Sequence, residues 1–302
     1  MAAPFDYDTF VMRNAGYVSA ETQAKIRNTT LLIAGCGIGS GPAVCAARIG
    51  FRKFVLVDGD TVDAHNLNRQ FYDFADIGKP KVDALKEKIL RINPEAEVEA
   101  INAYLNAENT DQIIGKGQIV FDTVDFLDLE AILRLHNSAR NHGAHIFTAL
   151  SVGYGALVWY FPPKDGPSLP EIIAPDEAAV RAASGGTASY ADVFSKFIKR
   201  LVPYLDMQVI EQVSSVLKKM KDGKPCPASQ VAVGAFAISA MAISMMQDVL
   251  AGDPVVASPR LVIHSFRSQR TQIVDLSSNP WTRFKRLFHW AGFLVRARGL
   301  GK

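Results

Sequence analysis

The chain has 302 residues, of which 48% are hydrophobic and 21% are charged. This balance is typical of a globular protein with a sizeable core and excludes a disordered chain. The formal net charge of +3 is too small to predict nucleic-acid binding, and the three cysteines lack Cys-x-x-Cys spacing, which excludes a disulfide framework and a four-thiolate zinc site. Because the N-terminus also lacks a secretory signal pattern, a cytoplasmic protein is expected.

Strands and helices alternate over residues 28–150, which predicts a doubly wound, mainly parallel sheet of the Rossmann-like α/β class. The expected elements, in chain order, are a helix at 20–27, a strand at 30–34, a helix at 42–49, a strand at 54–58, a helix at 81–91, strands at 97–101 and 119–121, a helix at about 128–141, a strand at 145–148, a helix at 228–250 and strands at 261–266 and 272–276. The first two strands are uninterrupted apolar runs, as strands buried on both faces should be.

The chain divides by composition into three parts and a C-terminal tail, residues 281–302. Residues 1–163, with an N-terminal arm over 1–27, are expected to form the main α/β domain, which the motifs described below assign to nucleotide binding. Proline, glycine and serine punctuate residues 164–227, which predicts a variable helical insertion or cap over the sheet. Residues 228–280 return to the same domain and close the sheet with antiparallel strands. Their apolar helix is about long enough to span a bilayer, but its Ala, Ser, Gly and Gln content predicts a buried core helix.

A glycine-rich loop follows the first strand. Gly35, Gly37 and Gly39 lack side chains, so backbone amides and the N-terminus of the next helix can approach an anion closely. Methyltransferases, dehydrogenases and adenylating enzymes all use such loops, so this loop alone predicts only that a nucleotide binds. Asp58 and Asp60 close the second strand, where a carboxylate can accept both hydroxyls of a ribose. A turn-capping role is the alternative, and it fits Asp60 better than Asp58.

A polar and basic cluster lies downstream of the loop and consists of Asn66, Arg69, Gln70 and Lys81. An amide, a guanidinium and an ammonium near a phosphate-binding loop suit a triphosphate undergoing chemistry better than a dinucleotide that is only held. Any single Arg or Lys could instead be an ordinary surface cation. Lys81, however, begins a predicted helix, where a positive charge opposes the helix dipole, and this placement indicates an anion nearby.

Two acidic residues, Asp122 and Asp125, end a later strand at the carboxyl edge, where sheets of this class bind ligands. One of these carboxylates could hold Mg²⁺ against a triphosphate. Helix capping by Asp125 or Asp128 is the alternative interpretation.

Two features near the C-terminus have open interpretations. Cys226 stands between two prolines ahead of the predicted core helix, and because helix N-termini activate thiols it is a candidate nucleophile. A lone thiol between prolines also describes an inert loop. The C-terminal tail, residues 281–302, begins with a basic amphipathic stretch that could lie on an anionic membrane, dock on a partner or pack against the rest of the chain.

The ordered set of motifs resembles the ThiF/MoeB superfamily, the sulfur-carrier adenylyltransferases related to ubiquitin-activating enzymes. The resemblance covers residues 9–163 and again 226–280. The motifs that carry it are Arg13 in Met-Arg-Asn, Gln23, the glycine loop, Asp58 in Val-Asp-Gly-Asp, Asn66-Leu-Asn-Arg69-Gln70, Gly-Lys-Pro-Lys81, Arg91-Ile-Asn-Pro94 and Asp125 in Asp-Thr-Val-Asp. Families that share only the glycine loop lack the Asn-x-x-Arg-Gln and Lys-Pro-Lys elements.

The resemblance implies an enzyme that uses ATP and Mg²⁺ to adenylate a carboxylate and releases pyrophosphate. It places Asp58 on the ribose and Asp125 on Mg²⁺, while Asn66, Arg69 and Lys81 contact the phosphates. It also implies a homodimer in which Arg13 reaches the γ-phosphate bound by the other subunit. Cations in these places would neutralise charge that accumulates on the phosphates and on the leaving pyrophosphate.

Two departures from the family pattern bear on these expectations. Related members often carry a pair of Cys-x-x-Cys zinc knuckles, but the corresponding places read Asp165-Gly-Pro-Ser-Leu-Pro and Asn279-Pro280-Trp-Thr-Arg, so zinc is not expected. The family's Asp-Asn pair is Asp125-Phe126 here. The acceptor stays open between a ubiquitin-like or sulfur-carrier protein, a peptide and, less favoured, a tRNA as in the threonylcarbamoyladenosine-cyclising relatives. A catalytically inactive partner subunit is a further alternative.

Overall fold

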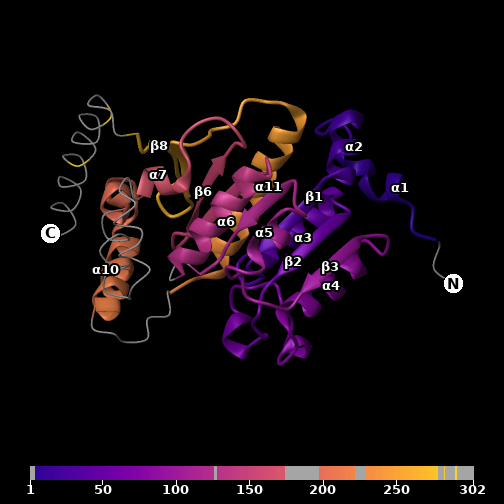
Figure 1. Cartoon of the computed structure of the whole chain (residues 1–302), viewed down its shortest axis with the longest axis horizontal. Coiled ribbons are helices and arrows are strands. Elements are labelled where there is room, and N and C mark those ends of the chain that lie inside the picture. Colours follow the sequence, from indigo (N-terminus) through magenta and orange to yellow (C-terminus); the bar gives the residue numbers. More distant parts are fainter. Residues whose placement is uncertain are drawn as a thin grey trace.

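The computed structural model describes residues 4–125, 128–173, 197–221 and 229–277, together with residues 282 and 290. Within these residues one mixed eight-stranded sheet has the order β3-β2-β1-β4-β5-β6-β7-β8 (Figure 1). The strands are β1 (Thr30–Ala34), β2 (Lys53–Val57), β3 (Glu97–Ile101), β4 (Ile119–Asp122), β5 (His145–Ser151), β6 (Gly155–Phe161), β7 (Arg260–Ser265) and β8 (Arg270–Asp275). Strands β1 to β5 pair in parallel, and β6, β7 and β8 add antiparallel pairs. The predicted fold class is confirmed.

The central strands are buried on both faces of the sheet. In β1, Leu31 and Ile33 belong to the core on one face, whereas Leu32 and Ala34 belong to the core on the other. All four side chains are fully buried. This burial explains why the strand reads as an uninterrupted apolar run rather than as an alternation.

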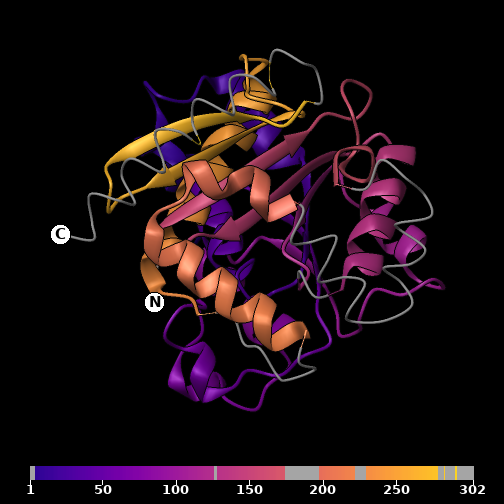
Figure 2. The same ribbon diagram turned by 90° about the vertical axis from the view of Figure 1, so that its left-hand side faces the viewer.

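Helices cover both faces of the sheet (Figures 1 and 2). The core on the side of Leu31 includes residues of α3 (Ser40–Ile49), α4 (Lys81–Ile92) and α11 (Ala232–Ala251). The core on the side of Leu32 includes residues of α5 (Thr110–Ile114), α6 (Leu129–Asn141) and α7 (Leu169–Ile173), and partly buried residues of α10 (Met207–Lys221) pack against it. Among the described residues of the predicted insertion, those of α7 and α10 therefore complete a face of the sheet.

Helix α11 is long and apolar enough to cross a membrane by length and composition. It lies on the sheet, however, and packs against α3 and β6. Small residues allow this close packing: a Cβ at Gly41 of α3 would lie 2.4 Å from the Ser239 hydroxyl of α11. The small residues that predict a core helix are thus the residues that let α11 pack closely against α3.

The N-terminal arm consists of α1 (Tyr7–Val11), η1 (Met12–Asn14) and α2 (Ala20–Asn28), and it is fastened to the C-terminal end of α3. The Tyr7 hydroxyl donates to the carbonyl oxygen of Gly50 at 2.8 Å. The side-chain amides of Asn14 and Gln23 both donate to the carbonyl oxygen of Ile49, each at 3.0 Å. The arm therefore lies at the end of α3 opposite the glycine loop (Figure 1).

Gly35→Ala is expected to lower the free energy of unfolding by about 3 kcal/mol or more, the upper part of the range for local backbone strain. Gly35 has a φ of +91°, and a Cβ there would lie 2.4 Å from the carbonyl oxygen of Thr123. Gly252→Ala is the matched control, because Gly252 has a φ of +84° and nothing within 4 Å of the added Cβ. Urea titration of both variants measures the losses, and equal losses would contradict the close approach at Gly35.

Candidate functional site

The strand register brings three of the predicted motifs to one edge of the sheet. Ala34, at the end of β1, pairs with Val57 of β2 and with Asp122 of β4. The residues that follow these strands are the glycine loop, Asp58 and the turn that reaches Asp125. They therefore share the carboxyl edge, where doubly wound sheets bind their ligands.

The glycine loop is a tight turn between β1 and α3. A Cβ at Gly39 would lie 2.3 Å from the carbonyl oxygen of Gly35, so the loop can close only without a side chain there. The Ser40 hydroxyl donates to the carbonyl oxygen of Gly37 at 2.6 Å and accepts the Phe71 N–H at 2.9 Å. Ser40 thus ties the loop to the segment that carries the predicted basic cluster.

Asp58 holds the glycine loop in place. Its Oδ2 accepts the Cys36 N–H at 2.7 Å, and its Oδ1 accepts the Asp60 N–H at 2.8 Å. Burial raises the pKa of Asp58 above its ordinary value, and the positive charge of Lys81 offsets this effect only in part. The carboxylate fixes the loop backbone and has further lone pairs that can accept ribose hydroxyls.

Lys81 has the nearby anion that its place at the start of α4 predicts, and this anion is Asp60. Lys81 Nζ lies 2.7 Å from Asp60 Oδ2, and the Lys81 side chain is only 8% exposed. Asp60 Oδ1 accepts the Tyr104 hydroxyl at 2.5 Å. Burial raises the pKa of Asp60, but the hydrogen bonds from Lys81 and Tyr104 outweigh it, so that the pKa is lowered. The pair holds the ammonium beside the loop, where a phosphate can also meet it.

Asp60→Asn is expected to lower the free energy of unfolding by about 1–2 kcal/mol at neutral pH, because it leaves the buried Lys81 ammonium without its partner. The half-exposed position of Asp60 keeps the loss below that of a fully buried pair. The difference from the unmodified chain should be complete above the ordinary carboxyl pKa of 3.8 and should vanish as the pH falls through the lowered pKa of Asp60.

Urea titrations at a series of pH values measure this difference. Asp73→Asn is the control, because it removes a 70% exposed partner of Lys88 and should cost about 0.5 kcal/mol. A loss at Asp60 that does not change with pH would contradict the role of the ion pair.

Arg69 is anchored by uncharged oxygens. Its Nε donates to Gln230 Oε1 at 2.7 Å, and its Nη1 donates to the carbonyl oxygen of His65 at 2.7 Å and to Asn68 Oδ1 at 2.9 Å. Burial lowers the pKa of the guanidinium, which stays cationic at neutral pH. Because none of these three acceptors carries a charge, the positive charge of Arg69 is left for an anion.

Asn66 and Gln70 are buried around the same turn. Asn66 ends η2 (Ala64–Asn66), and its Oδ1 accepts the Asp63 N–H at 3.0 Å. Gln70 packs under the loop, since a Cβ at Gly37 would lie 3.2 Å from its Nε2. Its Oε1 is buried and has no hydrogen-bond partner among the described residues. Both side chains therefore shape the turn that positions Arg69.

The two acidic residues after β4 face different surroundings. Asp122 is buried, and its Oδ2 accepts the Thr148 hydroxyl at 3.0 Å and lies 3.2 Å from His136 Nε2. Asp125 is exposed at the carboxyl edge. Asp128 caps α6, because its Oδ1 accepts the Ala131 N–H in the first turn of this helix at 2.9 Å. Of the two predicted magnesium ligands, Asp125 is exposed and Asp122 is buried. The contact of Asp122 with His136 has no signal in the sequence.

The structure does not gather all the predicted residues. Arg13 is exposed on the N-terminal arm, at the far end of α3 from the glycine loop. Cys226 and nearly all of the C-terminal tail lie outside the described residues, so the proposed nucleophile stays a prediction. Within the residues that the structure does describe, no group of three or more His, Cys, Asp or Glu side chains could hold a metal ion.

Comparison with known proteins adds to this geometry. The sequence profile described as the ThiF family matches residues 11–282. The tRNA threonylcarbamoyladenosine dehydratase of Bacillus subtilis is 37% identical over 116 residues, which cover 37% of this chain and 46% of that protein. A probable molybdopterin-synthase adenylyltransferase of Porphyra purpurea is 36% identical over 110 residues, covering 36% and 29%. The matches thus span less than half the length of these two curated relatives.

Among solved structures, the chain is similar in fold to Escherichia coli MccB in complex with AMPCPP and MccA. The TM-score is 0.64 at 19% sequence identity, and the match covers 92% of this chain and 75% of the other.

Proposed function

The chain belongs to the ThiF family, and on this premise we propose that it is an ATP-dependent adenylyltransferase that activates a carboxylate. The observation that carries the proposal is the carboxyl edge of the sheet. There Asp58 holds the glycine loop near the Lys81–Asp60 pair, and Ser40 bonds the backbone of Phe71, two residues after Arg69, whose described acceptors are all uncharged. Asp60 already balances the charge of Lys81, so Arg69 is the cation that favours a reacting triphosphate over a dinucleotide that is only held.

In this reaction the protein mainly has to position the reactants and stabilise negative charge, and it does not have to form a covalent bond itself. A carboxylate oxygen of the acceptor attacks the α-phosphorus of ATP, the bond to the bridging oxygen of the β-phosphate breaks, and pyrophosphate leaves with that bond's electron pair. Arg69 and Lys81 stabilise the negative charge that grows on the phosphates. The loop amides and Asp58 hold the nucleotide so that the reacting atoms meet in line.

Mg²⁺ fits the exposed carboxylate of Asp125, because this ion accepts one or two protein carboxylates and completes its shell with phosphates and waters. When bound, Mg²⁺ would neutralise charge on the triphosphate. The protein's own contribution at this point is the turn after β4, which Asp122 braces by accepting the Val124 N–H at 3.2 Å.

The acceptor that we propose is the C-terminal carboxylate of a peptide or a small ubiquitin-like or sulfur-carrier protein. The fold likeness to MccB, solved with MccA, and the relative named molybdopterin-synthase adenylyltransferase support this class. A tRNA acceptor is the second candidate, and the relative named tRNA threonylcarbamoyladenosine dehydratase favours it. The net charge of +3 does not favour a tRNA, because binding a nucleic-acid backbone rests on many basic contacts.

We further propose a homodimer in which Arg13 of one subunit completes the ATP site of the other. Arg13 lies beside the C-terminal end of α3, because the neighbouring Asn14 bonds the carbonyl oxygen of Ile49 there. The glycine loop lies at the other end of this ten-residue helix, about 15 Å away. Arg13 therefore meets its own site less easily than a neighbour's.

Exchange of pyrophosphate into ATP tests the proposed activity. Purified protein is expected to bind ATP, and to catalyse exchange when a suitable peptide carboxylate is present. Titrations with S-adenosylmethionine and NAD separate the two other enzyme classes that use such a loop. Tight binding of either of these ligands, together with no binding of ATP, would overturn the proposal. If the protein binds ATP but no class of acceptor supports pyrophosphate exchange, the result would instead identify an inactive partner subunit.

A further inference from the structure

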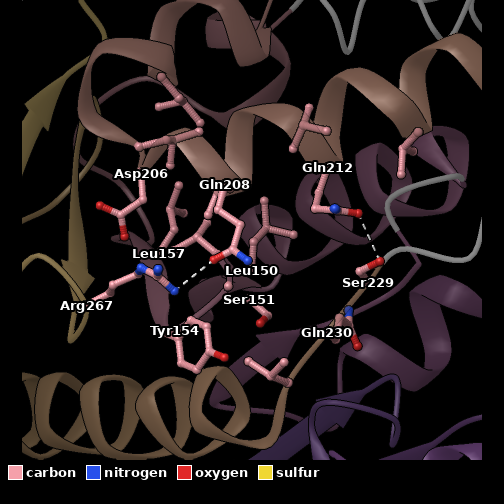
Figure 3. A pocket seen from close by; sticks show the side chains of 18 of the residues that line it. Leu150, Ser151, Tyr154, Leu157, Asp206, Gln208, Gln212, Ser229, Gln230 and Arg267 are labelled. Carbon is pink, nitrogen blue, oxygen red and sulfur yellow. Dashed lines mark hydrogen bonds between the residues drawn. The ribbon is translucent and has the colours of Figure 1, made fainter. Parts of the chain in front are cut away.

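A cavity of about 280 Å³ lies next to the carboxyl edge of the sheet, between the β5–β6 turn and α10 (Figure 3). Leu150 and Leu157 form its floor on the sheet. Helix α10 and the turn before it cover it from above, and residues 229–231, which lead into α11, form one wall. Aliphatic side chains dominate the lining, for example Leu201, Leu205, Val209, Val213, Val216 and Val231.

The size of this cavity sets it apart from a packing defect. An apolar cavity of about 150 Å³ is enough to hold benzene, so a space of this size takes a leucine or phenylalanine side chain with room for adjoining backbone. Cavities that bind ligands combine apolar walls with a few polar groups that fix orientation. The described residues therefore form a space suited to one large apolar side chain.

Three separate sets of polar side chains interrupt the apolar lining of the cavity. Arg267 Nη1 donates to Gln208 Oε1 at 3.1 Å, and the Ser229 hydroxyl donates to Gln212 Oε1 at 3.1 Å (Figure 3). The Ser151 hydroxyl is buried and has no hydrogen-bond partner among the described residues. Its oxygen lies close to Gly234 of α11, where an added Cβ would lie 2.2 Å from it.

One residue joins this cavity to the proposed ATP site. Gln230 lines the cavity, and its Oε1 accepts the Arg69 Nε–H at 2.7 Å. The short segment to which it belongs reaches Val231 with extended backbone angles, φ −122° and ψ 152°. An extended acceptor chain can therefore run beside residues 229–231, with its side chain in the cavity and its carboxylate directed to Arg69.

We propose that this cavity is the specificity pocket of the acceptor site, and that it takes a large apolar side chain at the last or the penultimate residue of a polypeptide acceptor. The proposal rests on the adenylation proposed above and narrows its substrate. It favours a peptide or protein tail that ends in a residue such as leucine or phenylalanine over a tail that ends in Gly-Gly. A Gly-Gly tail would leave the aliphatic walls without a partner.

The test compares acetylated peptides that are identical except for their last two residues. One set carries leucine or phenylalanine at one of these positions, and the other set ends in Gly-Gly, Ala-Ala or Gly-Lys. Pyrophosphate exchange gives kcat/KM for each peptide, and calorimetry without ATP gives its affinity. We expect the apolar set to be favoured by roughly tenfold or more in both measurements, since apolar pockets discriminate by about this much.

Two variants of α10 link the preference to the cavity. Val213→Trp places an indole in the cavity and should reduce the preference to within about twofold, while leaving ATP binding unchanged. Ser215→Trp adds the same indole at an exposed position of the same helix and should keep the preference. Neither residue contacts the proposed ATP site.

The outcomes separate the two proposals. Equal use of both peptide sets, better use of Gly-Gly, or an unchanged preference in Val213→Trp would overturn the pocket assignment and leave adenylation standing. Binding of the apolar set without any exchange would support the pocket and overturn adenylation of these acceptors. If no peptide binds and none supports exchange, the pocket assignment is overturned. Exchange with a different class of acceptor would then show that the proposed adenylation itself still holds.

Discussion

Arg69→Ala is expected to slow adenylation by about a hundredfold or more, since removing one charge partner of a transition state costs about 3 kcal/mol. The half-buried guanidinium is held in place by the Gln230 side chain and by the carbonyl oxygen of His65, and these neutral partners do not use up its charge. Asp125→Ala should have an effect of similar size, because it removes the exposed carboxylate assigned to Mg²⁺.

Single-turnover formation of AMP and pyrophosphate exchange measure this effect, and thermal unfolding shows whether the fold is retained. Arg134→Ala is a matched control for the loss of a guanidinium, because Arg134 lies on α6 and pairs with Glu130 of the same helix. It should leave the rate within about twofold. Near-normal exchange in both Arg69→Ala and Asp125→Ala would mean that the site is wrongly placed.

The sequence predicts the parallel half of the sheet well, because physical signals there are strong and local. Each of β1 and β2 is an apolar run that ends at a glycine or an aspartate, and α4 has a clear amphipathic period stopped by Asn93-Pro94. Strand β6 was not predicted. All seven of its residues are buried and form an apolar run like that of β1, but only residues 152–154 separate this run from β5, so no crossover helix marks it as a separate strand. Helix α5 was also missed, since five residues are too few to show a helical period.

The sequence also predicts which motifs meet, but not how their atoms pair. Parallel topology alone brings the ends of β1, β2 and β4 to one edge. Asp122 and Asp125 are three positions apart, and only the structure shows that the first is buried against His136 and the second is exposed. Among the acceptors of Arg69, Gln230 is the one far away in the chain, and no local pattern connects these two residues. Long-range pairs of this kind depend on tertiary packing.

The second large effect concerns Arg13. Mixing equal amounts of Arg13→Ala and Asp125→Ala chains is expected to recover activity that neither variant has alone. If subunits pair at random, half of the dimers are mixed and each of these has one complete site, so about a quarter of the unmodified activity should return. Pyrophosphate exchange after co-expression of the two chains measures this recovery.

A second mixture tests the same arrangement by the activity that is lost, whereas the first mixture tests it by the activity that is recovered. The double variant Arg13→Ala/Asp125→Ala is combined in equal amounts with the unmodified chain. If Arg13 acts across the dimer, the mixed dimers have no complete site and only about a quarter of the activity is kept; if it acts within its own chain, about half is kept. The structure favours the first result, because the contacts of Tyr7, Asn14 and Gln23 hold the arm at the end of α3 far from the glycine loop. A monomer in solution that still adenylates would exclude the arrangement.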